Sequence, residues 1–184
     1  RPPRSTLFPY TTLFRSIGSA LVDILVHETD DFVEKAGAVK GGMAYVDNRV
    51  IDEAVRMASV TPYYVPGGSA CNTVIGVGRL GGRARFVGKS CKGNLAGICE
   101  SSLKTNNVEP FLSKSTSLTG RVLSIITPDA QRSMLTYLGA SAEARPEDIS
   151  PECFRGAAVA HVEGYLLFNR ELILWALEIG RAHV

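Results

Sequence analysis

The sequence predicts an α/β protein with a mostly parallel sheet, helices on both faces of that sheet, and a small additional β-sheet that could act as a lid. Short apolar runs typical of buried strands alternate with segments of helical spacing, which favours parallel strands joined by helices. Two β-rich segments, 41–46 and 119–138, lack intervening helices and therefore fit a separate small sheet. Hydrophobic residues make up 45% and charged residues 21% of the 184 residues, a balance typical of a globular domain with a hydrophobic core.

Each strand is expected where apolar residues run together. In chain order the predicted strands are 17–26, 41–46, 84–88, 119–126, 133–138 and 159–168. Helical spacing and glycine boundaries predict helices at 50–59, 69–80, 94–104 and from Arg170 onward. Residues 62–68 are expected to form a turn-rich bend, and residues 127–130 a hairpin-like turn within the lid.

The two ends of the chain are unusual in composition. Residues 1–16 contain three arginines and no acid, as an organelle transit peptide does. They also resemble the translation of a DNA-sequencing adapter, and residues 178–184 resemble the translation of the matching adapter. We therefore expect 1–16 and 178–184 to be non-native and outside the fold. Without them the formal net charge of +2 becomes −1 for 17–177, so charge gives no support for a nucleic-acid partner.

Cysteine and histidine usage argues against a metal site. The four cysteines include no C-x-x-C pair, and none of the three histidines lies near a cysteine or another histidine. Reduced thiols in a cytoplasmic protein are the simplest interpretation. No run approaches the roughly 20 apolar residues that a membrane span needs, so we expect no membrane partner.

Two glycine patterns suggest phosphate binding but have the wrong context. Residues 76–81 match G-x-G-x-x-G, which in a nucleotide-cofactor oxidoreductase follows a strand and opens a helix. Here the pattern lies toward the end of a predicted helix, whereas that alternative requires a strand at 72–77. Gly88, Lys89 and Ser90 resemble the end of a Walker A loop, but the spacing from Gly82 is one residue too long.

The more informative pattern is the pair Gly67 and Gly68, which precedes a predicted helix, with Asn72 one turn further on. Paired glycines let backbone N–H groups approach a ligand oxygen, and Asn72 would project its amide beside the same helix start. A tight turn with a satisfied asparagine explains these residues equally well. The residues alone leave both interpretations open.

Three blocks together resemble one family. Residues 66–89, with the paired glycines, Asn72 and a later Leu-Gly, are similar to the N-terminal signature of ribokinase-like (PfkB-type) carbohydrate kinases. Residues 18–24 resemble the family's first strand, and residues 119–141 resemble the lid of its adenosine-kinase-like branch. The similarity covers 17–177, which would then be the N-terminal part of a ribokinase-like kinase domain with lid pieces at about 41–46 and 119–138.

This resemblance implies roles for five residues. Asp23, at the carboxyl end of the first strand, would accept hydrogen bonds from sugar hydroxyls, and Gly67, Gly68 and Asn72 would complete the sugar site. Arg132, from the lid, would stabilise the phosphates being transferred. The implied parent is a cytoplasmic monomer or homodimer that uses ATP and Mg²⁺ to phosphorylate a primary hydroxyl of a small-molecule sugar or nucleoside, with adenosine the leading acceptor.

Two departures from the family pattern matter. Cys91, Gly93 and Ala96 stand where the family usually has Gly, Asp and Gly, as genuine differences or as sequence errors. The family's Gly-Ala-Gly-Asp motif, which supplies the catalytic base and an anion hole, is absent from this sequence, so we expect the chain as given to have no kinase activity. Other acceptors of the fructokinase or ribokinase type, and a non-catalytic sugar-binding module, remain alternatives.

Overall fold

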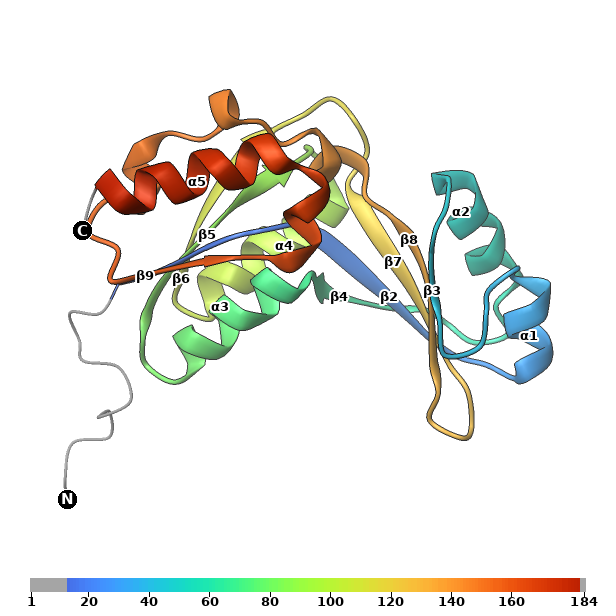
Figure 1. Ribbon diagram of the computed structural model, residues 1–184. Helices are drawn as coiled ribbons and strands as arrows, with labels where there is room; N and C mark the ends of the chain where they lie inside the picture. Colours follow the sequence, from blue (N-terminus) through green and yellow to red (C-terminus); the bar gives the residue numbers. More distant parts are fainter. Residues whose placement is uncertain (1–12, 183–184) are drawn as a thin grey trace, which may run out of the picture.

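The computed structural model describes residues 13–182 and contains two sheets, between which the chain passes four times (Figure 1). The first sheet has four parallel strands. In spatial order they are β6 (Val108–Lys114), β5 (Arg83–Ser90), β1 (Leu13–Ile17) and β9 (Val159–Val162). This arrangement confirms the predicted parallel α/β sheet.

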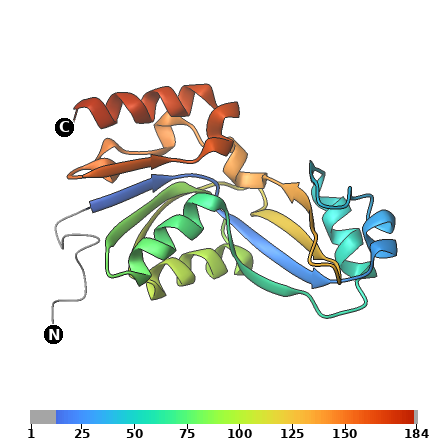
Figure 2. The ribbon, with the colours of Figure 1, turned by 60° about the horizontal axis from the view of Figure 1, so that its bottom comes forward.

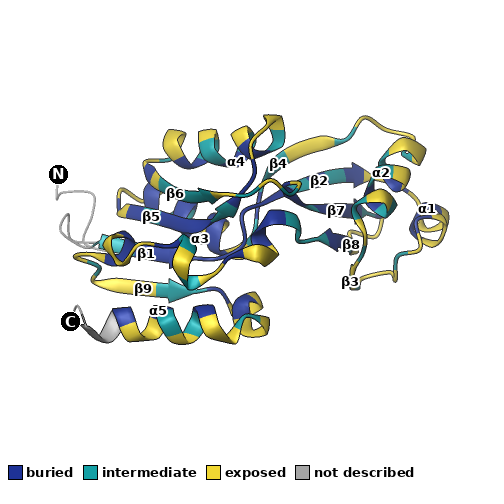
Figure 3. Ribbon diagram, turned by 90° about the horizontal axis from the view of Figure 1, so that it is seen from above, coloured by how far each residue is buried: buried dark blue, intermediate teal, exposed yellow. Residues whose placement is uncertain are grey.

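Helices cover both faces of the four-stranded sheet (Figure 2). One face is covered by α3 (Ser69–Arg79) and α4 (Asn94–Thr105), and the other by α5 (Arg170–Ala182). Three 3-10 turns, η1 (Gly139–Glu143), η2 (Pro146–Asp148) and η3 (Pro151–Phe154), connect the lid to β9. The buried residues lie between these layers, and the outer faces of the helices are exposed (Figure 3).

The second sheet has five strands and contains the predicted lid. In spatial order they are β3 (Met43–Tyr45), β8 (Arg132–Tyr137), β7 (Gly120–Ile126), β2 (Leu21–His27) and β4 (Tyr63–Gly67). Side chains alternate between its faces. One face packs on α1 (Asp30–Lys35) and α2 (Asn48–Met57), and the other face is lined by a pocket. The lid is therefore larger than predicted, because β2 and β4 belong to it.

The predicted single strand at 17–26 is wrong. The chain forms β1, leaves the first sheet at residues 18–20, and enters the second sheet as β2. A Cβ on Gly18 would overlap the side chain of Ala70 and lie 2.8 Å from Oε2 of Glu163, so the crossing depends on a residue without a side chain. The run of mostly apolar residues, broken by Asp23, gave no clear sign of such a change of sheet, because both strands are largely buried.

The expectation that both ends lie outside the fold is wrong for the described residues. Leu13–Ser16 belong to β1, where Arg15 and Ser16 are buried between β5 and β9. Residues 178–182 continue α5, and Ile179 is buried in the adjoining core. Residues 1–12 and 183–184 lie outside the described part of the chain. The foreign origin of the two ends stays a prediction.

Smaller differences follow from local chemistry. Residues 63–67 are strand β4 and not a bend, because they pair antiparallel with β2 despite Pro66. Strand β6, an edge strand that contains Pro110, and the short helix α1 were not predicted from the sequence. The predicted strand at 159–168 ends at Val162 and is followed by the 3-10 turn η4 (Gly164–Phe168). Within residues 13–182, no helix has the length and apolar character needed to cross a membrane.

Candidate functional site

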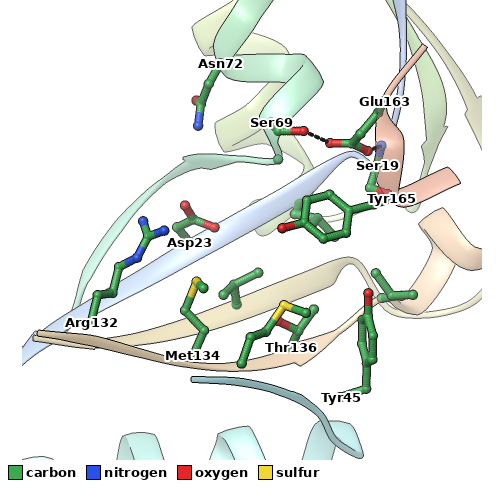
Figure 4. Close-up of a pocket in the computed structure, with 15 residues that line it drawn as sticks. Ser19, Asp23, Tyr45, Ser69, Asn72, Arg132, Met134, Thr136, Glu163 and Tyr165 are labelled. Atoms are coloured by element: carbon green, nitrogen blue, oxygen red, sulfur yellow. Dashed lines mark hydrogen bonds between the residues drawn. The ribbon is translucent and has the colours of Figure 1, made fainter. Parts of the chain in front are cut away.

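A pocket of about 200 Å³ lies between the lid sheet and the start of α3 (Figure 4). Three parts of the fold contribute to it: the crossing and β2, the amino end of α3, and the lid strands, with two residues after β9 closing one side. Its lining residues are Ser19, Leu21, Asp23, Met43, Tyr45, Gly68, Ser69, Asn72, Val122, Arg132, Met134, Thr136, Leu138, Glu163 and Tyr165.

Asp23 is the carboxylate at the centre of the pocket. It is the third residue of β2, so the predicted position at the carboxyl end of the first strand is wrong. Asp23 nevertheless lines the same pocket as Ser19, which follows β1 in the crossing between the sheets. Burial raises the pKa of Asp23 to about 6, and the nearby Arg132 guanidinium opposes that rise. The side chain is thus a partly desolvated acceptor that is mostly ionised at neutral pH.

Gly67 and Gly68 join β4 to α3 and serve different purposes. Gly67 is buried against Asp23, and a Cβ there would overlap Oδ1 of that carboxylate. Gly68 has φ +93°, in the region that favours glycine, and a Cβ there would overlap the carbonyl oxygen of Ser19. Gly67 therefore leaves room for the Asp23 carboxylate, and Gly68 lets the start of α3 approach the backbone at Ser19. That these glycines also let N–H groups approach a ligand oxygen stays a prediction.

The amino end of α3 points its first turn at the pocket. Gly68 is the N-cap and supplies no side chain, so backbone N–H groups at this end have no cap from that residue. Asn72 lies one turn into the helix with its amide directed toward the pocket (Figure 4). Asp23, Gly68 and Asn72 are thus on one side of the molecule, which is the arrangement that the sugar-site prediction required.

Glu163 is a site residue that the sequence analysis missed. It follows β9 and is only 1% exposed. Its Oε2 accepts the backbone N–H of Ser19 at 2.7 Å, and its Oε1 accepts the Ala70 N–H at 3.1 Å together with the hydroxyl of Ser69. A carboxylate is favourable at a helix start because of the helix dipole. The sequence did contain one signal for this residue, because Glu163 is the only acid in the otherwise largely apolar segment 159–168.

Arg132 begins β8 and is exposed at the far end of the pocket from Glu163 (Figure 4). Its guanidinium lies on the Asp23 side and acts on that carboxyl electrostatically. Of the five residues singled out from the sequence, Asp23, Gly68, Asn72 and Arg132 line the pocket, and Gly67 supports Asp23 from behind.

The competing glycine patterns do not form phosphate sites. Residues 76–79 are the last turn of α3, so the strand at 72–77 that an oxidoreductase would need is a helix. Gly88, Lys89 and Ser90 are part of β5 and do not form a loop. Among residues 13–182 no cluster of three or more His, Cys, Asp or Glu side chains could hold a metal ion. No described group of side chains is therefore assigned to Mg²⁺, and Arg132 is the cationic side chain among those that line the pocket.

A parallel sheet with helices on both faces, a β lid and a pocket between them define a ribokinase-like α/β fold. Residues 33–173 match the pfkB family carbohydrate kinase domain. The chain therefore belongs to the pfkB family of carbohydrate kinases. The match begins after Asp23, so the place of Asp23 in the site rests on the pocket geometry.

The chain is similar to several kinases of this family. It is 29% identical over 156 residues to Probable fructokinase-4 of Arabidopsis thaliana, covering 80% of this chain and 48% of that protein. It is 30% identical over 125 residues to 5-dehydro-2-deoxygluconokinase of Geobacillus thermodenitrificans, covering 64% and 37%. The crystal structure of adenosine kinase from Sinorhizobium meliloti superimposes with a TM-score of 0.85 at 32% identity, covering 94% and 54%. The chain thus spans about half the length, or less, of these relatives.

Proposed function

We propose that this chain is the acceptor-binding part of an ATP-dependent kinase that transfers the γ-phosphate to a primary hydroxyl of a sugar or nucleoside. The observation that carries the proposal is the convergence of Asp23 with the glycine-paired start of α3 in one pocket beneath the lid. A carboxylate can accept hydrogen bonds from both hydroxyls of a vicinal diol, and Asn72 in the first turn of α3 has a side-chain amide directed toward the same pocket.

Each site residue has a distinct task in this proposal. Asp23 orients the acceptor by its diol, while Gly67 and Gly68 keep the space beside it free, and Asn72 contributes an amide. Arg132 would meet the transferred phosphate and stabilise its spreading charge. In the proposed parent protein, ATP would supply the phosphoryl group and Mg²⁺ would neutralise its oxygens, and none of the roles assigned above is to hold either of them.

The chain as given is proposed to bind an acceptor without phosphorylating it. Positioning alone does not complete the transfer, because the reaction also needs a base for the hydroxyl proton and donors for the developing charge. The Gly-Ala-Gly-Asp motif expected to supply both is absent from the sequence.

Adenosine is our leading acceptor. The pocket is lined by apolar and aromatic side chains beside its polar end, among them Met43, Met134 and Tyr45, and such surfaces suit a purine. The structural similarity to an adenosine kinase supports this choice. Fructose is the second candidate, supported by the sequence similarity to a fructokinase. The alternative function is a non-catalytic sugar-binding module. Such a protein would use the same pocket to bind a sugar but would not be part of a larger kinase.

Isothermal titration of the purified 184-residue chain with adenosine and with fructose tests the proposal. We expect saturable binding of at least one of them, abolished by Asp23→Ala, and no ADP formation when ATP and Mg²⁺ are added. Absence of binding by a folded chain would refute the acceptor site, and ADP formation dependent on the acceptor would refute the proposed lack of activity. If the chain is part of a kinase, a longer protein that includes the downstream coding sequence should phosphorylate the acceptor. If the chain is a non-catalytic binding module, the longer protein should show no phosphorylation.

A further inference from the structure

Thr136, on β8, has a hydroxyl without a partner in the lining of the pocket. The residue is 4% exposed, and its Oγ1 is buried with no hydrogen bond. Two other described residues, Arg15 and Ser90, also have a buried polar side-chain atom with no partner, but neither lines this pocket. An unpaired buried hydroxyl is costly to a folded protein, and such groups often mark a place where a ligand completes the bonding.

The surroundings explain why Thr136 finds no internal partner. Its strand lies between β3 and β7, and its carbonyl already accepts the N–H of Val46 at 2.9 Å. The next pair along the same face of the lid is Met43 and Met134, which offers the hydroxyl no strong acceptor. Thr136 therefore has the apolar pair Met43 and Met134 on one side along the pocket lining, and no hydrogen bond joins its hydroxyl to its strand partner Tyr45 (Figure 4).

The strand register places Thr136 in one row with Asp23. Val122 of β7 is paired with Asp23 on one side and with Thr136 on the other, and Tyr45 continues the row on β3. All four residues line the pocket. Neighbouring strands are about 4.8 Å apart, so Asp23 and Thr136 are separated by two spacings, about 9.5 Å. A single sugar ring held by Asp23 is too short to reach Thr136, whereas a nucleoside extends across the row.

We propose that Thr136 is a specificity-determining residue whose hydroxyl forms a hydrogen bond with the base of a nucleoside when the ribose diol is bound at Asp23. This inference rests on the proposed acceptor site and narrows its substrate class to nucleosides. A threonine hydroxyl both donates and accepts, so it can pair with an amino group or a ring nitrogen. The base gains access by displacing the flexible side chain of Met43, which is 41% exposed at the mouth of the pocket.

Two variants separate binding from packing. Thr136→Val keeps the shape and removes the hydroxyl, and Thr136→Ser keeps the hydroxyl. We expect Thr136→Val to weaken adenosine binding about 5- to 15-fold by titration calorimetry, with Thr136→Ser restoring most of the affinity. Fructose binding, where it occurs, should be the same in all three proteins. The melting temperature of unliganded Thr136→Val should not fall, because the substitution removes an unpaired polar group.

The outcomes distinguish the inference from the proposed function. If Thr136→Val binds adenosine as tightly as the unsubstituted 184-residue chain does, the proposed role of Thr136 is overturned, whereas the proposed acceptor site is not. If the unsubstituted 184-residue chain binds fructose but not adenosine, the proposed role of Thr136 is also overturned, because the acceptor would then have no base to contact Thr136. If the parent chain binds neither compound, the proposed acceptor site fails and the inference fails with it.

Discussion

Asp23 and Gly67 lie in such close contact between β2 and β4 that a Cβ on Gly67 would overlap Oδ1 of Asp23 and lie 3.0 Å from its backbone nitrogen. The strand register makes them diagonal neighbours, since Gly67 is paired with Leu21 and Asp23 with Val65. The carboxylate therefore occupies the space that a side chain at residue 67 would fill. The Asp23 carboxylate, which is the proposed diol-binding group, can take this position only because Gly67 has no side chain.

Gly67→Ala tests this dependence. The new methyl group must displace the Asp23 carboxylate or the strand, so we expect a loss of about 1–3 kcal/mol in the free energy of unfolding and a marked loss of adenosine affinity. Urea unfolding and titration calorimetry measure the two effects. Gly76→Ala is the matched control, because a Cβ there meets nothing within 4 Å and alanine favours the helix by about 0.5–1 kcal/mol. Similar behaviour of the two variants would show that Gly67 does not position Asp23.

Glu163→Gln should destabilise the junction of the two sheets. The Glu163 carboxylate receives donors from Ser19, Ser69 and Ala70, and a glutamine would turn its own NH₂ group toward one or more of them. We expect a loss of about 2–4 kcal/mol in the free energy of unfolding, measured in urea. Glu152→Gln is the control, since Glu152 is exposed and paired with Arg155, and should change stability by less than about 1 kcal/mol. A Glu163→Gln protein as stable as its control would contradict the structural account.

The sequence predicted the layers of the fold because its signals were local. Helices α2, α3 and α4 and strands β5, β7 and β8 carry their own periodicity and glycine boundaries, and they were placed within a few residues. The division of residues 17–26 between two sheets could not be predicted in this way, because β1 and β2 are both apolar and the crossing depends on contacts with Ala70 and Glu163, distant in sequence.

The candidate site was predictable where its residues adjoin in sequence and unpredictable where they meet through the fold. Gly67, Gly68 and Asn72 form one short motif, and the resemblance added Asp23 and Arg132. Glu163 and Thr136 join the same pocket only because β9 and β8 are placed beside it by sheet register. Thr136 has no sequence pattern of its own that indicates a site, and the only signal for Glu163 is that it is an acid within the otherwise apolar segment 159–168.

The four cysteines should be unreactive in the folded chain. All are free and buried, and burial raises the pKa of Cys153 to about 11. The hydrogen bond with Cys99 raises the pKa of Cys71, whose sulfur lies 3.8 Å from that of Cys99, beyond disulfide length. We expect Ellman's reagent at pH 8 to react slowly with native protein and to count four thiols after unfolding.

Ser101→Cys provides a positive control for thiol accessibility, because residue 101 is exposed on α4 and a thiol there should react at once. An original cysteine that reacts as fast as this introduced one would contradict the packing around it: α3 against α4 for Cys71 and Cys99, η3 against the sheet for Cys153, or the contact of Cys91 with Ala96 and Ala140.

The raised pKa of Asp23 predicts opposite pH dependences for stability and for binding. Its folded-state pKa of about 6 lies above the ordinary value of 3.8, so the folded chain holds a proton that the unfolded chain releases. The free energy of unfolding then falls as pH rises through 6, and Asp23→Asn, which stays neutral, should be more stable than the parent at pH 8. Because Asp23 is partly solvated, we expect a difference on the order of 1 kcal/mol, vanishing near pH 4.

Adenosine affinity should instead rise as pH rises through 6, because the ionised Asp23 carboxylate is a stronger hydrogen-bond acceptor for a diol than the protonated form. The parent chain should lose adenosine affinity as pH falls below 6, and Asp23→Asn should bind weakly at every pH. Urea unfolding and calorimetry of both proteins between pH 4 and 8 provide the comparison, in which the titration of all other groups cancels. A stability difference that stays constant over this range would show that Asp23 is not held in the desolvated position on which the proposed site depends.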